Sequence, residues 1–189
     1  NGNGYSNEWL EEAERRGLPN LVSTVDALPK YTEEKYVSMF EKFKVYSAKE
    51  IKSRTEILLE NYSKVINIEA LTMLDMVKKQ ILPACISYTK TLCDSAISKD
   101  TVGIDSSVEK SLASKISSLT ASIVNEVKAL DEKVISAQDC EEGEAMARFY
   151  RDEVFTQMQT LRASVDECEM CIPEDVWPMP SYTKLLFTV

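Results

Sequence analysis

Histidine is absent from this 189-residue sequence, and glycine and proline are scarce, with five and six residues. Histidine is the commonest general base, a frequent metal ligand and the side chain whose charge changes near neutral pH, so its absence removes all three roles. The few glycines and prolines leave little material for the many turns of a β fold. Neither a signal peptide nor a run of about 18 apolar residues is present, so we expect a soluble, cytoplasmic chain that does not enter a membrane.

The remaining composition is that of a globular chain, with 44% hydrophobic and 28% charged residues. A chain of this length is able to bury a sizeable core. The net charge of −9 disfavours nucleic acid and anionic membranes as partners. The cysteines form an odd set, which favours free thiols in a reducing compartment; they are Cys85, Cys93, Cys140, Cys168 and Cys171.

The longest helical pattern runs from Ser47 to Ser98 and contains no glycine and a single proline, Pro83. Ser47 with Glu50 three positions later forms a capping box, which predicts the start of the helix. Pro83 predicts a kink near Leu82 with helix on both sides, because proline removes a backbone hydrogen bond. Apolar residues between positions 65 and 82 surround this helix and predict burial on nearly all sides; they are Val65, Ile66, Ile68, Ala70, Leu71, Met73, Leu74, Met76, Val77, Ile81 and Leu82.

Two short helices are predicted before this stretch. Ser6 or Asn7 caps the first, which Gly17 ends, and Thr32 caps the second. Residues 18–30 show no clear period and predict an ordered, extended connector. The sequence opens on Asn-Gly-Asn-Gly, a turn signal, and not on methionine, so we interpret it as a fragment of a longer protein or a trimmed chain. Residues 1–46 are thus expected to be a connector and residues 47–189 a helical bundle domain.

After a turn at Gly103, residues 106–138 predict a third long helix. Its apolar positions follow a near-heptad spacing that is typical of helix packing; they are Val108, Leu112, Ile116, Leu119, Ile123, Val127, Leu130 and Val134. The same helix is rich in serine. These small side chains indicate either close approach of a neighbouring helix or a solvated face; they are Ser111, Ser114, Ser117, Ser118 and Ser122.

Residues 141–170 predict the last long helix, which the short break before it makes antiparallel to its predecessor. Its expected apolar stripe consists of Ala145, Phe149, Met158, Leu161, Val165, Cys168 and Ile172. A three-helix bundle of residues 84–171 follows, and the tail with Trp177 and a final LLFTV run is expected to pack on it or on another surface. The predicted fold is therefore all-α, with a long kinked central helix in an antiparallel three- to four-helix bundle, short N-terminal helices and an irregular C-terminal tail.

Few residues suggest chemistry. Cys168 and Cys171 form a Cys-x-x-Cys motif, but the predicted position at a helix C-terminus raises a thiol pKa, and a zinc site lacks two further ligands. We therefore interpret both as structural thiols. Glu69 and Asp75 lie in the most apolar part of the long helix, where a buried carboxylate is either catalytic, metal-binding or held in a structural ion pair. From these residues alone the chain is interpreted as a helical scaffold or interaction domain.

Four segments together resemble the C-terminal region of type III glutamine synthetases. They are NGNGYSNEWLEEAERRGLPNL, DALP, SRTEILLENYSKVINIEALTMLDMVKKQILPA and VWPMPSYTKLLF. The resemblance implies a cytoplasmic parent enzyme that makes glutamine from glutamate and ammonia with ATP and Mg, assembled as a ring-based homo-oligomer, a dodecamer. It also implies that catalytic residues lie upstream in a β-rich domain. None of that domain's motifs matches a position here, so no catalytic, cofactor or metal residue is assigned, and the opening segment is the part expected nearest to an active site.

The apolar half of the long helix carries the interface hypothesis. The short N-terminal helices are too small to cover it, so we predict that it packs on the parent's catalytic domain or a neighbouring subunit through Leu71, Leu74, Met76 and Val77. Two alternatives stay open. An independent helical-bundle interaction module would expose an apolar groove for a peptide, and a small redox protein would need a low thiol pKa at Cys168 or Cys171.

Overall fold

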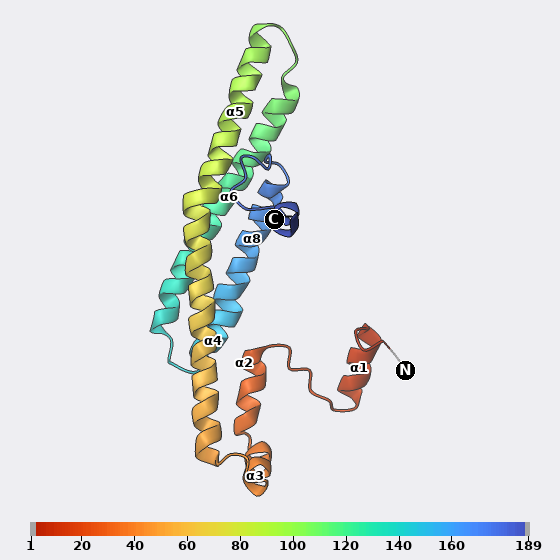
Figure 1. The fold of residues 1–189 in the computed structure, drawn as a ribbon, viewed down its shortest axis with the longest axis vertical. Coiled ribbons are helices and arrows are strands. Elements are labelled where there is room, and N and C mark those ends of the chain that lie inside the picture. Colours follow the sequence, from red (N-terminus) through yellow and green to blue (C-terminus); the bar gives the residue numbers. More distant parts are fainter. Residues whose placement is uncertain (1–2, 188–189) are drawn as a thin grey trace. The chain divides into compact units, whose positions relative to one another are not determined.

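The computed structural model describes residues 3–187, all of whose regular elements are helices (Figure 1). The all-α prediction is thereby confirmed. The central element comprises α4 (Ala48–Met76), a π-helical turn (Val77–Ile81) and α5 (Leu82–Thr101), 54 helical residues in succession. Asn1, Gly2, Thr188 and Val189 lie outside the described residues, so the opening turn and the final apolar run are described only in part.

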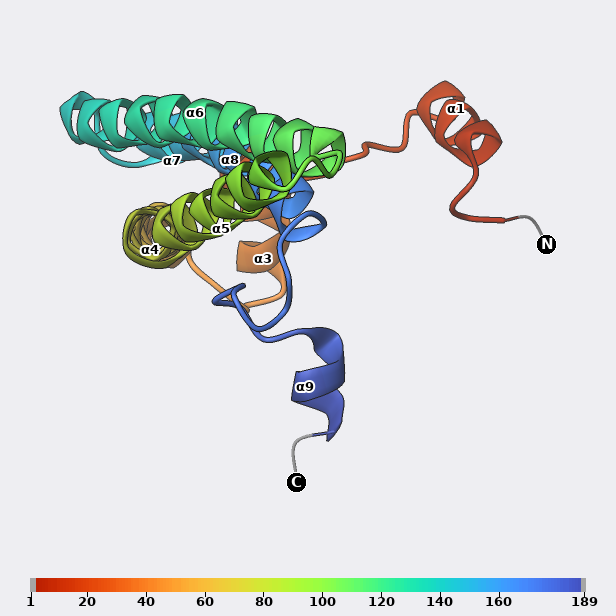
Figure 2. The same ribbon diagram turned by 90° about the horizontal axis from the view of Figure 1, so that it is seen from above.

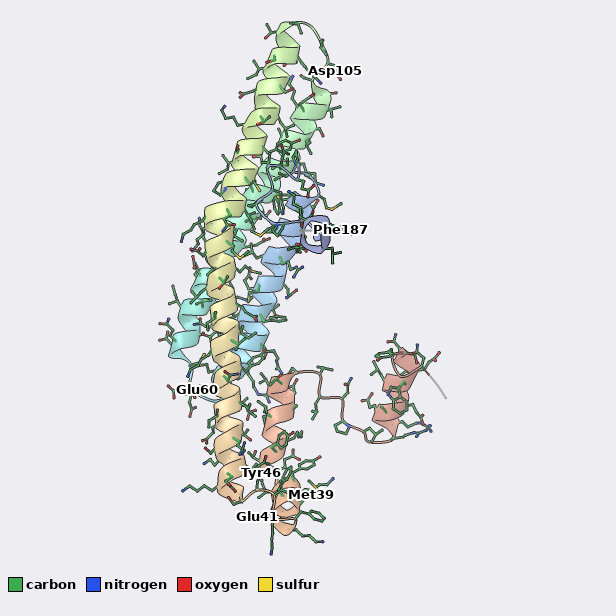
Figure 3. All side chains as sticks on the ribbon, in the orientation of Figure 1. Met39, Glu41, Tyr46, Glu60, Asp105 and Phe187 are labelled. Carbon is green, nitrogen blue, oxygen red and sulfur yellow. The ribbon has the colours of Figure 1, made fainter. Side chains whose placement is uncertain are left out.

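The capping box at the start of α4 is confirmed. The backbone N–H of Ser47 donates to Glu50 Oε2 at 2.8 Å, and the N–H of Glu50 donates to Ser47 Oγ at 3.3 Å. These hydrogen bonds lower the pKa of the Glu50 carboxyl. Two residues labelled in Figure 3 make further contacts at the start of α4. Glu41 accepts a hydrogen bond from the N–H of Ala48 at 3.0 Å, and the centre of the Tyr46 ring lies 4.7 Å from the Arg54 guanidinium.

The disturbance expected at Leu82–Pro83 takes the form of a π turn just before the proline. The N–H of Leu82 donates to the carbonyl of Val77, five residues back, instead of four. Pro83 has no N–H, and its ring would crowd the carbonyl four residues earlier in a regular helix. The wider turn at Val77–Ile81 accommodates the proline, and the helix continues through it.

The prediction that the central helix is buried on nearly all sides is wrong. Its buried apolar side chains recur every three or four residues along one face, as in an ordinary amphipathic helix; they include Ile51, Leu59, Ile66, Ala70, Leu74, Val77 and Ile81. Of its other apolar side chains, Met73, Met76 and Leu82 are half-buried, and Ile57, Leu58, Val65, Ile68 and Leu71 are exposed. The described residues of this chain therefore cover only part of the apolar surface that the sequence provides.

Backbone contacts divide the chain into two compact units. Unit 1 comprises residues 1–64 and 141–148, and unit 2 comprises residues 65–140 and 149–189. This division differs from the expected domains, residues 1–46 and 47–189, which stay a prediction because contacts do not test independent folding.

Unit 1 contains α1 (Asn7–Arg15), α2 (Thr24–Ala27), a 3₁₀ turn (Leu28–Thr32), α3 (Glu34–Lys42) and the first part of α4. Ser6 caps α1 and Gly17, with φ of 71°, follows its end, as predicted. The expected extended connector instead contains α2 and the 3₁₀ turn. Thr32 is not a helix cap, because its hydroxyl donates to the carbonyl of Pro29.

The signal for α2 is a capping box that the sequence-based prediction missed. The N–H of Asp26 donates to Ser23 Oγ at 3.1 Å, and the Ser23 hydroxyl donates to the Asp26 carboxylate at 2.6 Å. This short turn places apolar side chains in a small core of unit 1, formed by Val25, Leu28, Leu59, Ala147 and the half-buried Tyr62.

Unit 2 is built on α5, α6 (Ser107–Ser136) and α8 (Thr156–Glu169). Figure 2 shows α6 lying beside both α5 and α8, and α5 and α6 are joined by a tight turn with Gly103 at φ of 75°. A 3₁₀ turn (Ala137–Asp139), α7 (Glu144–Phe149) and a π turn (Tyr150–Phe155) lie between α6 and α8 in sequence. The predicted antiparallel bundle is thus confirmed.

Burial within the bundle decides one open alternative and corrects one prediction. The five α6 serines named in the sequence analysis are all exposed, so this chain leaves them as a solvated face. In the last helix Ala145 is exposed and Phe149 only half-buried, whereas Ala147, Tyr150 and Val154 are buried. The helix begins at Glu144 and passes through a π turn, and both features shift the buried side away from the predicted positions.

The C-terminal tail divides into a buried and an exposed part. Trp177 packs back on the bundle, with 7% of its surface exposed. The short helix α9 (Tyr182–Phe187) exposes Leu185, Leu186 and Phe187, the last of which Figure 3 labels. Within residues 3–187, no helix combines the length and the apolar character needed to cross a membrane.

Candidate functional site

An apolar groove of about 850 Å³ lies within unit 2. One wall comes from the second part of α4 and the following π turn, the opposite wall from α8, and the end from the tail. The chain reaches this arrangement because Pro173 follows α8 and the carbonyl of Pro173 accepts from the N–H of Trp177 at 2.9 Å, which turns the tail back. We call this feature the groove; its apolar lining is Ile68, Met73, Met76, Val77, Ile81, Met158, Leu161, Val165, Trp177, Met179, Pro180 and Leu185.

The floor and the edges of the groove differ in burial. Val77, Ile81, Met158, Leu161 and Trp177 are buried and form a fixed apolar floor. The half-buried side chains around it include three of the four methionines of the lining. Because methionine is unbranched and polarizable, such a surface adapts to apolar side chains of different shapes. The groove therefore suits an apolar occupant better than a polar metabolite.

The rim of the groove is predominantly acidic. Glu69 on α4 and Glu169 at the end of α8 are exposed, and neither has an ion pair or hydrogen bond among the described residues. The cation of the rim, Arg162, is paired with Asp166 at 3.4 Å. The two unpaired carboxylates thus lie on opposite walls and leave the rim with an excess of negative charge.

Trp177 carries a buried polar group without a hydrogen-bond partner beside the groove. Its indole Nε1 is buried, and no acceptor among the described residues lies within hydrogen-bonding distance. A buried tryptophan N–H usually has a partner. The indole ring nevertheless fills the end of the groove with a large apolar surface.

The four predicted interface residues are divided between core and surface. Leu74 is 3% exposed and belongs to the core of unit 2, so its side chain is not free for an outside contact. Leu71 is 49% exposed, Met76 is half-buried in the groove, and Val77, 2% exposed, is part of the groove floor. Of the predicted set, Leu71 and Met76 present the most apolar surface, and the interface itself stays a prediction.

The suspected buried carboxylates prove to be exposed. Asp75 forms an ion pair with Lys79 four residues later, and Glu69 lies on the rim of the groove. The expectation of a buried carboxylate is therefore wrong, because both residues face away from the single buried side of α4. Among residues 3–187 no group of three or more acidic, cysteine or histidine side chains is arranged to hold a metal ion.

The cysteines are free thiols in very different surroundings. Cys85 and Cys168 are buried, Cys93 is exposed and Cys171 is half-buried. A hydrogen bond with Cys85, together with burial, raises the pKa of the Cys168 thiol above its ordinary value. This environment opposes the thiolate that redox chemistry requires. Slow alkylation of Cys85 and Cys168 at neutral pH would support the structural interpretation, and rapid alkylation of Cys168 would contradict it.

A second apolar surface lies where α5 turns into α6, near Asp105 in Figure 3. Its exposed apolar side chains are Ile97, Val102, Ile104 and Val108, which we call the tip. The charged groups around the tip satisfy one another. Lys110 donates to Asp100 at 2.7 Å, the Ser107 hydroxyl donates to Asp105 at 2.7 Å, and Lys99 pairs with Glu109.

These bonds hold the carboxyl pKa values at the tip below their ordinary range. Lys110 and then Ser106 lower that of Asp100, Ser107 lowers that of Asp105, and Lys99 lowers that of Glu109. With its charges paired internally, the tip presents mainly apolar surface.

Of the four residues predicted to form an interface, Met76 and Val77 line the α4 wall of the groove, and the residues that α8 contributes were not predicted. A signal was present in the methionines, since Met73, Met76, Met158 and Met179 are four of the seven in the chain. Their separation in sequence hid their convergence. The apolar tail predicted that Trp177 packs on the bundle or on another surface, but no local pattern predicts that it lies at the end of this groove.

Comparison with known proteins gives consistent results. Residues 1–100 match the family model for the glutamine synthetase C-terminal domain. A glutamine synthetase of Butyrivibrio fibrisolvens is 35% identical over 191 residues, which cover 100% of this chain and 27% of that protein. The type-3 glutamine synthetase of Dictyostelium discoideum is 34% identical over 193 residues, 99% of this chain and 26% of that protein.

A glutamine synthetase of Bacteroides fragilis (strain YCH46) is 30% identical over 193 residues, which again cover 99% of this chain and 26% of the relative. The chain thus spans about a quarter of the length of the curated relatives it matches.

Proposed function

Since the chain belongs to the family of glutamine synthetase C-terminal domains, we propose that it is the helical C-terminal part of a type III glutamine synthetase. The whole enzyme would join ammonia to glutamate with ATP, and this part would make contacts and perform no catalysis. The observation that carries the proposal is the family match combined with apolar surface that unit 2 leaves uncovered. The relatives extend well beyond the matched region, which leaves room for a catalytic domain elsewhere.

ATP and a divalent metal belong to the proposed reaction of the whole enzyme. The described residues of this chain do not fit the metal, because their carboxylates are scattered along helices or paired with lysine and arginine. We therefore assign no residue of this chain to either group.

The contact role rests on two surfaces of unit 2. Along α4, Val65 and Leu71 are exposed outside the groove, and the tip adds four more apolar side chains. Contiguous exposed apolar surface on a soluble domain is typical of protein contacts. We propose that the α4 surface packs on the catalytic domain of the same chain or of a neighbour, and that the tip contributes to contacts between subunits of a cytoplasmic, ring-based homo-oligomer, a dodecamer.

The test compares variants of the full-length natural protein that contains this chain. Val65→Asp with Leu71→Asp places two charges on the exposed α4 surface outside the groove and leaves the core residue Leu74 intact. We expect a fall in molar mass by light scattering and a loss of glutamine formation, because burying two unpaired carboxylates is unfavourable. Ser122→Asp, which changes an exposed serine of α6, is the matched control. Unchanged mass and activity in the double variant would contradict the proposal.

The groove favours a second candidate function, an independent helical interaction module. This alternative predicted an exposed apolar groove, and unit 2 contains one. The two functions differ in their expected response to the same variants. For an independent module the full-length protein would retain its mass, any enzymatic activity and binding of a peptide to the groove when the α4 surface is charged.

A further inference from the structure

We propose that the groove of unit 2 binds a separate protein through a basic amphipathic helix. The inference rests on the proposed function, because it adds a reversible partner to a domain whose other surfaces make permanent contacts. The occupant would place a row of apolar side chains on the groove floor and lysine or arginine side chains at the rim.

The floor of the groove indicates that the side of the partner helix facing it is apolar. Val77, Leu161 and Trp177 are buried yet line the groove, and Met73 and Met76 flank them as half-buried, flexible side chains. Helix-binding grooves use the same combination, a fixed apolar floor with adaptable methionines around it. A volume of about 850 Å³ is sufficient for several large side chains from successive turns of a helix.

The rim fixes the charge of the occupant. Glu69 and Glu169 lie on opposite walls, both exposed and both without an ion pair among the described residues. Arg162 is neutralised by Asp166 at 3.4 Å. A helix in the groove would therefore pass between two unpaired carboxylates, which basic side chains on its two flanks would satisfy.

Charge also distinguishes a separate partner from other occupants. The chain carries a net charge of −9, so a second copy or an anionic lipid surface would be repelled from an acidic rim. A segment tethered to the same polypeptide gains little from electrostatic steering, because it does not have to find the groove by diffusion. Unpaired rim charges instead favour a separate partner, which has to find the groove by diffusion.

The experiment uses the full-length natural protein and two synthetic helical peptides of about 18 residues. One peptide combines leucine with lysine in an amphipathic pattern, and the other combines leucine with glutamate in the same pattern. Binding is measured by fluorescence anisotropy of the labelled peptides at low and high salt. We expect the basic peptide to bind about tenfold or more tightly than the acidic one, with a preference that salt weakens.

Two variants locate the effect. Glu69→Lys with Glu169→Lys reverses the rim and should abolish or invert the preference for the basic peptide. Asp94→Lys with Glu132→Lys makes the same change in net charge at exposed positions of unit 2 outside the groove, and the preference should persist. All four side chains are exposed, so neither variant disturbs the core.

Several outcomes would overturn the inference. Equal binding of both peptides, or the same loss of preference in both variants, would mean that the rim does not select the partner. A concentration-dependent mass increase that the rim variant abolishes would assign the groove to a second copy. Absence of binding to either peptide, with assembly still sensitive to Val65→Asp and Leu71→Asp, would overturn this inference and leave the proposed function standing.

Discussion

The bundle of unit 2 and the first 45 residues differ in how far their apolar side chains are buried. In α6, Ile116, Ile123 and Leu130 are fully buried within the chain. In the first segment Leu18, Leu21, Val22, Phe43 and Val45 are exposed, Val22 by 80%, and only a few apolar side chains such as Val25 and Leu28 are buried. The bundle buries a continuous core along α6 although it also leaves some apolar surface exposed, whereas the first segment leaves most of its large apolar side chains exposed.

The difference follows from element length. The helices α1 and α3 have nine residues each and α2 has four, whereas α6 has 30. Short helices bury too little surface to offset the entropy of ordering them, so they depend on contacts with other elements. Long helices with near-heptad stripes pack on one another. Helix length therefore favours a packed bundle in one region and a segment that depends on other elements in the other.

The largest expected effect comes from replacing one leucine by alanine in each region of the 189-residue chain and comparing the stability of the two variants. Leu130→Ala creates a cavity in the bundle and should lower the free energy of unfolding by about 2–5 kcal/mol. Leu21→Ala changes a partly exposed side chain and should cost no more than about 0.5 kcal/mol. Urea unfolding measures both values. Similar losses in the two variants would contradict the difference in burial.

A smaller loss of stability is expected at the start of α4, where local hydrogen bonds cap the helix. Ser47→Ala removes the cap and should destabilise the protein by about 1 kcal/mol. Ser53→Ala, at an exposed position inside the same helix, should be neutral or slightly stabilising because alanine is the better helix former. Thermal unfolding followed by circular dichroism compares them. A cap variant as stable as the Ser53 control would show that Ser47 and Glu50 do not determine where α4 begins.

The smallest effect concerns pH and the tip. The lowered pKa values of Asp100, Asp105 and Glu109 mean that these carboxyls bind protons more weakly in the folded chain than in the unfolded chain. Their contribution is present above the unfolded pKa values and is lost as the pH falls from about 5 through the folded values.

Helix content measured against pH should therefore decrease on acidification, and Asp100→Asn should make the decrease shallower. The exposed Glu132→Gln is the control. Identical acid profiles for Asp100→Asn and the unaltered protein would show that Lys110 and Ser106 do not stabilise the turn through Asp100.

The sequence predicted those features that local physics determines. The capping box of Ser47 and Glu50, the stop at Gly17 and the heptad stripe of α6 depend on neighbours within a few residues, and all three were predicted, although the first residue of the predicted stripe, Val108, is exposed. The disturbance next to Pro83 was also predicted, although its form as a π turn was not.

Features that depend on distant contacts were not predicted. Apolar composition around α4 did not show which side would be covered, so Leu71 and Leu74 were grouped although one is exposed and the other buried. The groove requires α8 and Trp177 to meet α4, and this convergence depends on the tertiary fold. Short sequence patterns carry little information of that kind.

The central claim is that the exposed surface of α4 is covered in the longer protein. Leu71→Cys tests it most directly through the rate of thiol modification, measured by mass spectrometry of the peptide in the 189-residue chain and in the full-length protein. Ser122→Cys is the exposed control, and the buried Cys85 and Cys168 report that each protein is folded. We predict that Leu71→Cys reacts as fast as the control in the short chain and much more slowly in the full-length protein. Equal rates in both proteins would contradict the claim.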